Sequence, residues 1–255
     1  MDYQKLFDIS GKIILITGGG GTLGTAICKG LAAVGAKIAV ADQNLESAHK
    51  TCDLIREYGT ECLPVQVDVT DPESVKAMVD QVLEKFGRID VLLNHAGINI
   101  RKPAVEYTPE EWEKVLTVNL SGIFHCAQAV GKVMLKQGSG RIINTASTLA
   151  SISQPLQAVY ASSKGGIVQL TKVLAEEWAP YGVNVNAIGP GYFETDLTRK
   201  YLSDPAVRDT LLTKIPMKRF GQPEELIGTI IFLSSEASTY VTGHTIYIDG
   251  GRLLY

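Results

Sequence analysis

Short apolar runs and longer amphipathic segments alternate along the chain. The apolar runs hold four to six residues and are rich in β-branched side chains, and helical patterns of ten or more residues follow several of them. This alternation is typical of a parallel sheet whose strands are joined by crossover helices. It predicts strands at residues 12–17, 37–41, 62–67, 91–94, 141–145, 183–188 and 245–248.

The intervening segments predict helices over 22–34, 45–58, 72–86, 108–136 and 155–179, and a last helix that begins near 222. Asp71-Pro72 and Thr108-Pro109 each combine an N-cap residue with a proline at the first helical position. Residues 194–215 are less regular. No repeat, linker or low-complexity tract divides the chain, so we expect one domain over residues 1–255.

Composition and charge are those of an ordinary globular protein. Of the 255 residues 45% are hydrophobic, and the net charge of −3 gives no basic patch for nucleic acid. The N-terminus shows no signal peptide and no apolar run could span a bilayer, so a cytoplasmic location is expected. The four histidines lack metal-ligand spacing, and no metal is expected. The four cysteines form no C-x-x-C pair and are predicted to be buried free thiols, at positions 28, 52, 62 and 126.

A glycine-rich loop follows the first predicted strand and precedes the first helix. Its sequence, from Thr17 to Gly24, is TGGGGTLG. Strand, glycine loop and helix in this order direct backbone N–H groups and a positive helix end at one volume, which suits a pyrophosphate. Asp42 ends the second strand, where a carboxylate accepts hydrogen bonds from ribose hydroxyls and repels a 2′-phosphate. The sequence therefore favours NAD over NADP. The alternative for the glycine loop is a flexible turn without a ligand, and the alternative for Asp42 is a solvated aspartate that caps the next helix.

Tyr160 and Lys164 lie four residues apart in a helical pattern, so their side chains share one face. A nearby cation favours the phenolate and lowers the pKa of the tyrosine, which makes it a better proton carrier near neutral pH. Ser147 follows the strand 141–145, at the end where parallel sheets bind ligands. Its hydroxyl is a candidate to hydrogen-bond a substrate oxygen.

With these motifs the chain resembles the short-chain dehydrogenase/reductase family over nearly its whole length. The shared motifs are the loop from Thr17 to Gly24, the segment Asn94-His95-Ala96-Gly97, Asp68-Val69, Asn119, Ser147, Tyr160 with Lys164, and Pro190-Gly191 followed by Thr195. The resemblance implies a Rossmann-type doubly wound α/β fold with a seven-stranded parallel sheet. It also implies hydride transfer between a nicotinamide cofactor and a secondary alcohol or ketone, in a homotetramer or homodimer.

The same resemblance assigns the roles. Tyr160 would act as general acid/base, Lys164 would lower its pKa and hold the nicotinamide ribose, Ser147 would polarise the carbonyl, and Asn119 would anchor a water or the helix near Lys164. The residues expected to contact the cofactor are Gly18, Gly20, Thr22, Leu23, Gly24, Asp42, Gln43, Asp68, Val69, Asn94, Ala96, Gly97, Tyr160, Lys164, Pro190, Gly191 and Thr195.

Two positions depart from the family pattern. Thr22 stands where the middle glycine of the loop is usual, and its Cβ would change how closely a pyrophosphate approaches. His95 replaces the usual second asparagine. It either keeps the hydrogen bonds of that loop or faces the site, and we favour the structural role.

Within the family the chain looks closest to the sugar-acid group, such as gluconate 5-dehydrogenase and the 3-deoxy-2-ketogluconate and 2-deoxygluconate dehydrogenases. The similar stretches include residues 96–104, 189–192 and 249–251. A sugar carboxylate favours a guanidinium that makes two parallel hydrogen bonds. Arg101 is the candidate for that contact, with Gln154 and Tyr192 as polar wall residues. The alternative is that Arg101 is a surface charge.

Two other functions stay open. One is the same chemistry on a 3-oxoacyl thioester or another small carbonyl compound, for which the chain offers only scattered basic candidates such as Lys200, Lys218 and Arg219. The other is a non-catalytic NAD-binding regulator, against which the complete catalytic set speaks.

Overall fold

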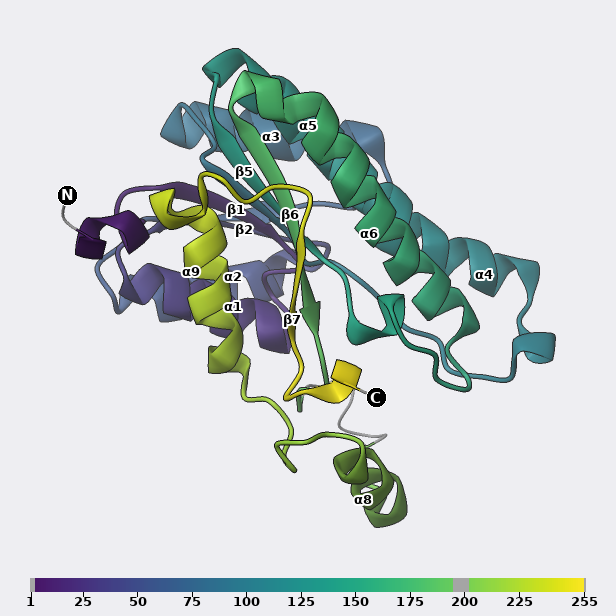
Figure 1. Cartoon of the computed structure of the whole chain (residues 1–255). Helices are drawn as coiled ribbons and strands as arrows, with labels where there is room; N and C mark the ends of the chain where they lie inside the picture. Colours follow the sequence, from purple (N-terminus) through teal and green to yellow (C-terminus); the bar gives the residue numbers. More distant parts are fainter. Residues whose placement is uncertain (1–2, 195–201, 255) are drawn as a thin grey trace.

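A seven-stranded parallel sheet forms the centre of the computed structural model, which describes residues 3–194 and 202–254 (Figure 1). The strand order is β3-β2-β1-β4-β5-β6-β7. The strands are β1 (Ile13–Thr17), β2 (Lys37–Asp42), β3 (Cys62–Gln66), β4 (Val91–Asn94), β5 (Gly140–Thr145), β6 (Val183–Pro190) and β7 (Thr245–Ile248). The predicted doubly wound fold is confirmed, and the predicted strand ends differ from the observed ones by two residues at most.

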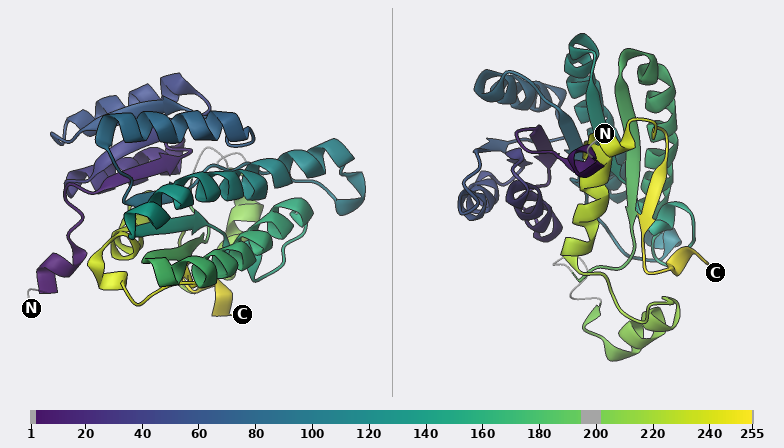
Figure 2. Two further views of the ribbon diagram at one scale, coloured as in Figure 1. Left: turned by 90° about the horizontal axis from the view of Figure 1, so that it is seen from above. Right: turned by 60° about the vertical axis from the view of Figure 1, so that its left-hand side comes forward.

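Helices cover both faces of the sheet. The α-helices are α1 (Thr22–Ala33), α2 (Leu45–Arg56), α3 (Pro72–Phe86), α4 (Pro109–Leu116), α5 (Gly122–Gln137), α6 (Ala158–Trp178), α8 (Pro205–Thr213) and α9 (Ile227–Ser234). Figures 1 and 2 show α1, α2 and α9 on one side and α3, α5 and α6 on the other. Along β1, Ile14 and Ile16 pack in the first layer, and Ile13 and Leu15 pack in the second. Both faces of the strand are apolar because both are buried.

The predicted helix over residues 108–136 is not continuous. Thr108 caps α4 with a capping box, but a π-helical segment over Thr117–Ser121 separates α4 from α5. Such insertions are frequent at functional sites, and this one contains the fully buried Asn119. The apolar pattern runs through the segment without interruption, so the sequence gives no sign of it. The helix predicted from 155 also starts later, at Ala158.

The segment around α8 projects beyond the carboxyl ends of β6 and β7 (Figure 1). It has a small core of its own, formed by Leu202, Leu211, Ile215 and Phe220. An ion pair from Arg208 to Glu194, at 2.6 Å, ties the helix to the chain that follows β6. This segment lies on the side of the sheet where parallel strands bind their ligands.

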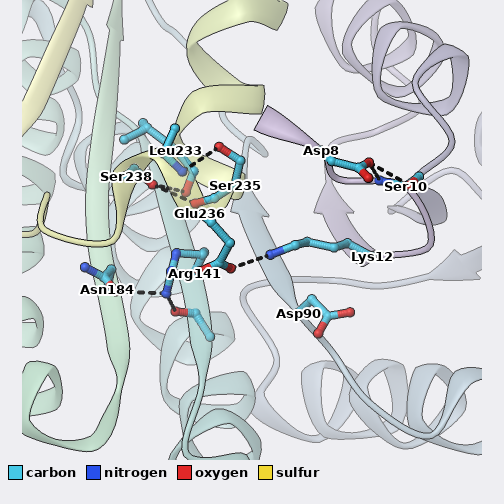
Figure 3. Close-up of polar contacts among 12 residues, drawn as sticks. Asp8, Ser10, Lys12, Asp90, Arg141, Asn184, Leu233, Ser235, Glu236 and Ser238 are labelled. Carbon is cyan, nitrogen blue, oxygen red and sulfur yellow. Dashed lines mark hydrogen bonds and ion pairs between the residues drawn. The ribbon is translucent and has the colours of Figure 1, made fainter. Parts of the chain in front are cut away.

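Charged side chains join the opposite, amino ends of the strands (Figure 3). Arg141 Nη1 donates to Asn184 Oδ1 at 2.9 Å, and Lys12 Nζ donates to Glu236 Oε1 at 3.2 Å. Glu236 also lies 3.8 Å from Arg141, and burial lowers the pKa of this arginine against the opposing effect of Glu236. The cluster connects β1, β5 and β6 to the segment after α9, far from the ligand-binding end.

The cysteine prediction is wrong for two of the four residues. Cys52 on α2 and Cys62 on β3 form a disulfide with a Cα–Cα distance of 5.6 Å. Packing of α2 against β3 brings them together, and their spacing in the sequence does not reveal it. Cys28 and Cys126 are buried free thiols, and burial raises the pKa of Cys126 to about 12. Among the described helices none is long and apolar enough to cross a bilayer.

Candidate active site

A cavity of about 1110 Å³ opens at the carboxyl ends of β1 and β4. The chain winds from β1 outward to β3 and then crosses back to β4, so these two strands mark the point where the strand order reverses. Thr17 and Asn94 are paired residues at their ends. In doubly wound sheets, ligands bind in this crevice. Residues from both halves of the sheet line it, including Gly18, Gly21, Thr22, Leu23, Gly24, Asp42, Gln43, Asp68, Val69, His95, Ala96, Gly97, Ser147, Tyr160, Lys164, Pro190 and Gly191.

The glycine loop is packed so tightly that a Cβ would lie too close to neighbouring atoms at several positions, among them Gly18 and Gly24. Gly18 adopts a φ of +70°, and a Cβ there would lie 2.8 Å from the Ala96 Cα. A Cβ on Gly24 would collide with the Gly18 carbonyl oxygen and lie 2.8 Å from the Gly19 Cα. The first turn of α1, from Thr22, therefore sits directly against the loop, with its N–H groups at the cavity. This arrangement fits a dinucleotide pyrophosphate.

Two carboxylates lie at the end of the cavity formed by β2 and β3. Asp42 accepts hydrogen bonds from the backbone N–H of Gly20 and of Asn44, each at 3.0 Å. Asp68 accepts from Thr70 Oγ1 at 2.7 Å and from Gln43 Nε2 at 3.2 Å. The Thr70 bonds lower the pKa of Asp68. Both carboxylates thus have fixed orientations at the place where the sequence predicts the adenosine.

Tyr160 and Lys164 lie on the same face of α6, beside Ser147 from the end of β5. Lys164 is 3% exposed, and its Nζ donates to the Thr145 carbonyl at 2.7 Å. The same Nζ lies 5.5 Å from the centre of the Tyr160 ring. Burial lowers the pKa of Lys164 to about 8. The three side chains line one cavity together with the glycine loop.

The pKa of Tyr160 departs from the expectation. Desolvation by the surrounding protein raises it, and this effect outweighs a hydrogen bond from Ser147 and the charge of Arg101, which both lower it. The predicted lowering by Lys164 is therefore not the net result. The reason is burial: it disfavours the charged forms of both the phenol and the ammonium.

Replacing Lys164 by methionine should change stability in a pH-dependent way. The pKa of Lys164 is about 8 in the folded protein against an ordinary value of 10.5, so below pH 8 folding buries a charge that the unfolded chain keeps in water. That cost fades as the pH rises from 8 to 10.5. Relative to the wild type, Lys164→Met should be more stable at pH 7 than at pH 10 by on the order of 1–3 kcal/mol. Urea unfolding measures this, and a stability difference that is the same at both pH values contradicts it.

Asn119 connects the loop after β4 to α6. Its Oδ1 accepts from the Ile98 N–H at 2.8 Å, and its Nδ2 donates to the Ile98 carbonyl at 2.9 Å and to Ser163 Oγ at 3.2 Å. Ser163 adjoins Lys164 in the sequence, so Asn119 fixes the loop relative to the helix that carries the candidate catalytic pair.

His95 combines the two roles considered from the sequence. Its backbone N–H donates to Thr17 Oγ1 at 3.2 Å, its Nδ1 lies 3.2 Å from Thr145 Oγ1, and the residue lines the cavity. Desolvation, with the nearby charge of Lys164, lowers the pKa of His95 to about 4. The ring is therefore neutral around pH 7.

Of the predicted substrate residues, Ser147 and Tyr160 line this cavity, whereas Arg101, Gln154 and Tyr192 are not among its lining residues. Tyr192 donates a hydrogen bond to Gln154 Oε1. Arg101 lies close enough to Tyr160 to affect its pKa. Two predicted cofactor residues, Gly20 and Asn94, are also not among the lining residues, and Asn94 Nδ2 donates to Asn144 Oδ1 at 3.0 Å. Thr195 lies outside the described residues.

Several lining residues belong to no motif that the sequence analysis singled out. These are Val67, Thr70, Ile98, Glu110, Glu113, Lys114, Thr117, Val118, Thr145, Ala146 and Phe193. Those from 110 to 118 belong to α4 and the π-helical segment, which extend beside the cavity. These residues can be identified only from the structure, in which α4 packs against α6.

Comparison with known proteins agrees with this geometry. A family profile described as enoyl-(acyl carrier protein) reductase matches residues 20–252. The gluconate 5-dehydrogenase of Gluconobacter oxydans is 35% identical over 251 residues, which cover 98% of both chains. The chain belongs to the short-chain dehydrogenase/reductase family. It is therefore an oxidoreductase that uses a nicotinamide cofactor and acts on alcohol or ketone groups.

Other members of this short-chain dehydrogenase/reductase family are similarly close. A 3-oxoacyl-[acyl-carrier-protein] reductase of Thermotoga maritima is 41% identical, with 96% of this chain and 99% of the other covered. The crystal structure of a gluconate 5-dehydrogenase from Burkholderia cenocepacia, in complex with NADP and tartrate, superposes with a TM-score of 0.96 at 39% identity, with 99% of each chain covered. Identity alone does not choose between sugar-acid and thioester substrates.

Proposed function

We propose that this oxidoreductase transfers hydride between a nicotinamide and a secondary alcohol or ketone of a sugar acid, of the gluconate or ketogluconate type. Tyr160 is the general acid/base, Ser147 holds the reacting oxygen, and Lys164 and Asn119 complete the catalytic set. The observation that carries this proposal is the cavity in which Tyr160, Lys164 and Ser147 lie beside a glycine loop shaped for a pyrophosphate. When bound, the cofactor supplies the hydride chemistry.

The proton path follows from the side chains. In reduction, the Tyr160 hydroxyl protonates the developing alkoxide while Ser147 donates a hydrogen bond to the same oxygen. In oxidation, the Tyr160 phenolate removes the alcohol proton. The Ser147 hydrogen bond and the Arg101 charge, which already lower the pKa of Tyr160 against the effect of burial, stabilise that phenolate.

The sugar-acid assignment depends on Arg101. Its positive charge acts on Tyr160, so a carboxylate bound to the guanidinium would lie near the reacting carbon. Arg101→Met should raise KM for a hexonate by about 10–100-fold and change KM for an uncharged polyol by less than about threefold. Steady-state kinetics on gluconate and sorbitol measure both. An equal effect on the two substrates would exclude a carboxylate contact, and preference for a 3-oxoacyl thioester would favour the alternative function.

We further propose that NAD is the preferred cofactor, although the Burkholderia relative holds NADP. The fixed Asp42 carboxylate would repel a 2′-phosphate, and the lysines among the residues lining the cavity, Lys114 and Lys164, lie on α4 and α6 rather than near β2. Asp42→Asn should lower kcat/KM with NAD and raise it with NADP, each by about tenfold.

The matched control for this charge removal is Asp68→Asn. Asp68 follows β3 rather than β2, and Thr70 and Gln43 hold its carboxylate. Its replacement should therefore affect the two cofactors by similar factors. A wild-type preference for NADP, or a cofactor ratio that Asp42→Asn leaves unchanged, would contradict the role given to Asp42.

We also propose that one domain carries both cofactor binding and catalysis, in a cytoplasmic homotetramer. Exposed aromatic and aliphatic side chains support association: Trp112 on α4, Phe124 on α5 and Val173 on α6 are each at least 38% exposed. Large apolar side chains left open on neighbouring helices are typical of surfaces that another subunit covers.

A further inference from the structure

Gln157 lies directly before α6, three residues ahead of Tyr160, and its side chain is almost fully buried, with 1% of the residue exposed. A buried amide needs hydrogen-bond partners, and those partners decide which end is the oxygen. With the oxygen toward Arg101, it accepts from Nε at 2.8 Å and from Nη2 at 3.2 Å. Its nitrogen then lies 3.1 Å from Asn99 Oδ1.

The opposite orientation would place amide N–H groups against the guanidinium. Because a guanidinium has only donors, both sides of the contact would then be donors. The chemistry of Arg101 therefore fixes the Gln157 amide as an acceptor. Asn99 and Arg101 both belong to the loop after β4, so one buried side chain joins this loop to the start of α6.

This contact determines where the Arg101 charge lies. Arginine has several rotatable bonds, and two hydrogen bonds to a buried partner restrict it to a narrow set of conformations. The partner precedes the helix that carries Tyr160, so Arg101 keeps a fixed relation to the phenol, whose pKa it lowers. Gln157 engages Nε and Nη2, whereas a carboxylate approaching the end of the guanidinium would use Nη1 and Nη2.

A neutral partner also preserves the charge. A glutamate at position 157 would hold Arg101 equally well but would cancel its attraction for an anion and oppose a phenolate at Tyr160. An amide orients the guanidinium without neutralising its positive charge.

We propose that Gln157 is a positioning residue that sets the preference for carboxylate-bearing substrates by holding Arg101 in place. This inference rests on the proposed sugar-acid function. Gln157 contacts neither substrate nor cofactor; it acts through Arg101.

The test is a double-mutant cycle on two substrates, gluconate and sorbitol. Gln157→Met keeps the length of the side chain and removes the acceptor. It should lower kcat/KM for gluconate about tenfold more than kcat/KM for sorbitol, because KM rises for gluconate alone, whereas a change in the pKa of Tyr160 affects kcat for both substrates. In the Arg101→Met background the same substitution should change the ratio of the two substrates less than twofold. Gln157→Glu should lower kcat/KM for gluconate by more than Gln157→Met does.

Gln137→Met is the matched control. Gln137 hydrogen-bonds the Ile89 backbone N–H and carbonyl at 3.2 and 2.9 Å, near the start of β4 and away from the cavity. Its replacement should reduce stability but leave the ratio of kcat/KM values unchanged. Equal losses on both substrates in Gln157→Met, or an undiminished effect in the Arg101→Met background, would overturn the inference.

The failure of the proposed function gives a different pattern. If Arg101→Met itself shows no selectivity, or no sugar acid is a substrate, the sugar-acid assignment fails. The positioning contact is then tested without substrate, by crystal structures of the wild type and of Gln157→Met. We expect the guanidinium of Arg101 to leave its place beside α6 in the variant. An unmoved Arg101 would overturn the contact as its determinant.

Discussion

Replacing Tyr160 by phenylalanine should lower kcat by about 10²–10⁴-fold and leave the affinity for the cofactor within about threefold. The phenol is the side chain of the cavity that combines a transferable proton with closeness to both Ser147 and Lys164. Phenylalanine keeps the ring and its packing but removes the proton. Steady-state turnover and cofactor titration by fluorescence measure the two quantities separately.

Tyr107→Phe is the matched control for this substitution. The Tyr107 hydroxyl donates to the Ile100 carbonyl at 2.5 Å, in the loop after β4. The substitution therefore removes one structural hydrogen bond near the site. We expect it to cost about 1 kcal/mol of stability and to change kcat less than tenfold. Equal losses of turnover in the two variants would mean that Tyr160 supports the fold rather than the proton transfer.

Gly24→Ala should lower the affinity for the cofactor by about a hundredfold or more. A Cβ at this position collides with the Gly18 carbonyl oxygen, so α1 and the glycine loop must separate. That separation displaces the N–H groups of the loop from the phosphate site, where their hydrogen bonds depend on position. Isothermal titration with NAD measures the effect, and circular dichroism checks that the variant folds.

The neighbouring Gly21 provides the control for this loop. A Cβ there would lie 3.6 Å from the Gly18 carbonyl oxygen, which is ordinary van der Waals contact, and its φ of −77° suits any residue. Gly21→Ala should change the cofactor affinity less than about threefold. If Gly21→Ala weakens binding as much as Gly24→Ala does, close packing of α1 is not what shapes the site.

The strands were predictable because their physical signal is local. Each is a short apolar run, the inner strands such as β1 and β4 are buried on both faces, and the observed ends depart from the predicted ones by two residues at most. The break between α4 and α5 was not predictable, since a π-helical turn alters the hydrogen bonding without disturbing the apolar pattern. The Cys52–Cys62 disulfide was not predictable for a related reason: it depends on how α2 packs against β3.

The candidate site also combines features that local sequence predicts with features that depend on packing. Residues in local motifs, such as the glycine loop and the pair Tyr160 and Lys164, line one cavity as the sequence suggested. The net pKa of Tyr160 could not be read from spacing, because burial outweighs the favourable neighbours. Gln157 was also missed, since its importance lies in a contact with a loop more than fifty residues earlier in the chain.

A crystal structure of the complex with NAD tests the central claim most directly. We predict that the pyrophosphate lies against the loop from Gly18 to Gly24, and that the nicotinamide ring lies within about 4 Å of the Tyr160 hydroxyl, on the side of Ser147. A nicotinamide bound away from Tyr160, or a cofactor seated outside the cavity at β1 and β4, would contradict the account.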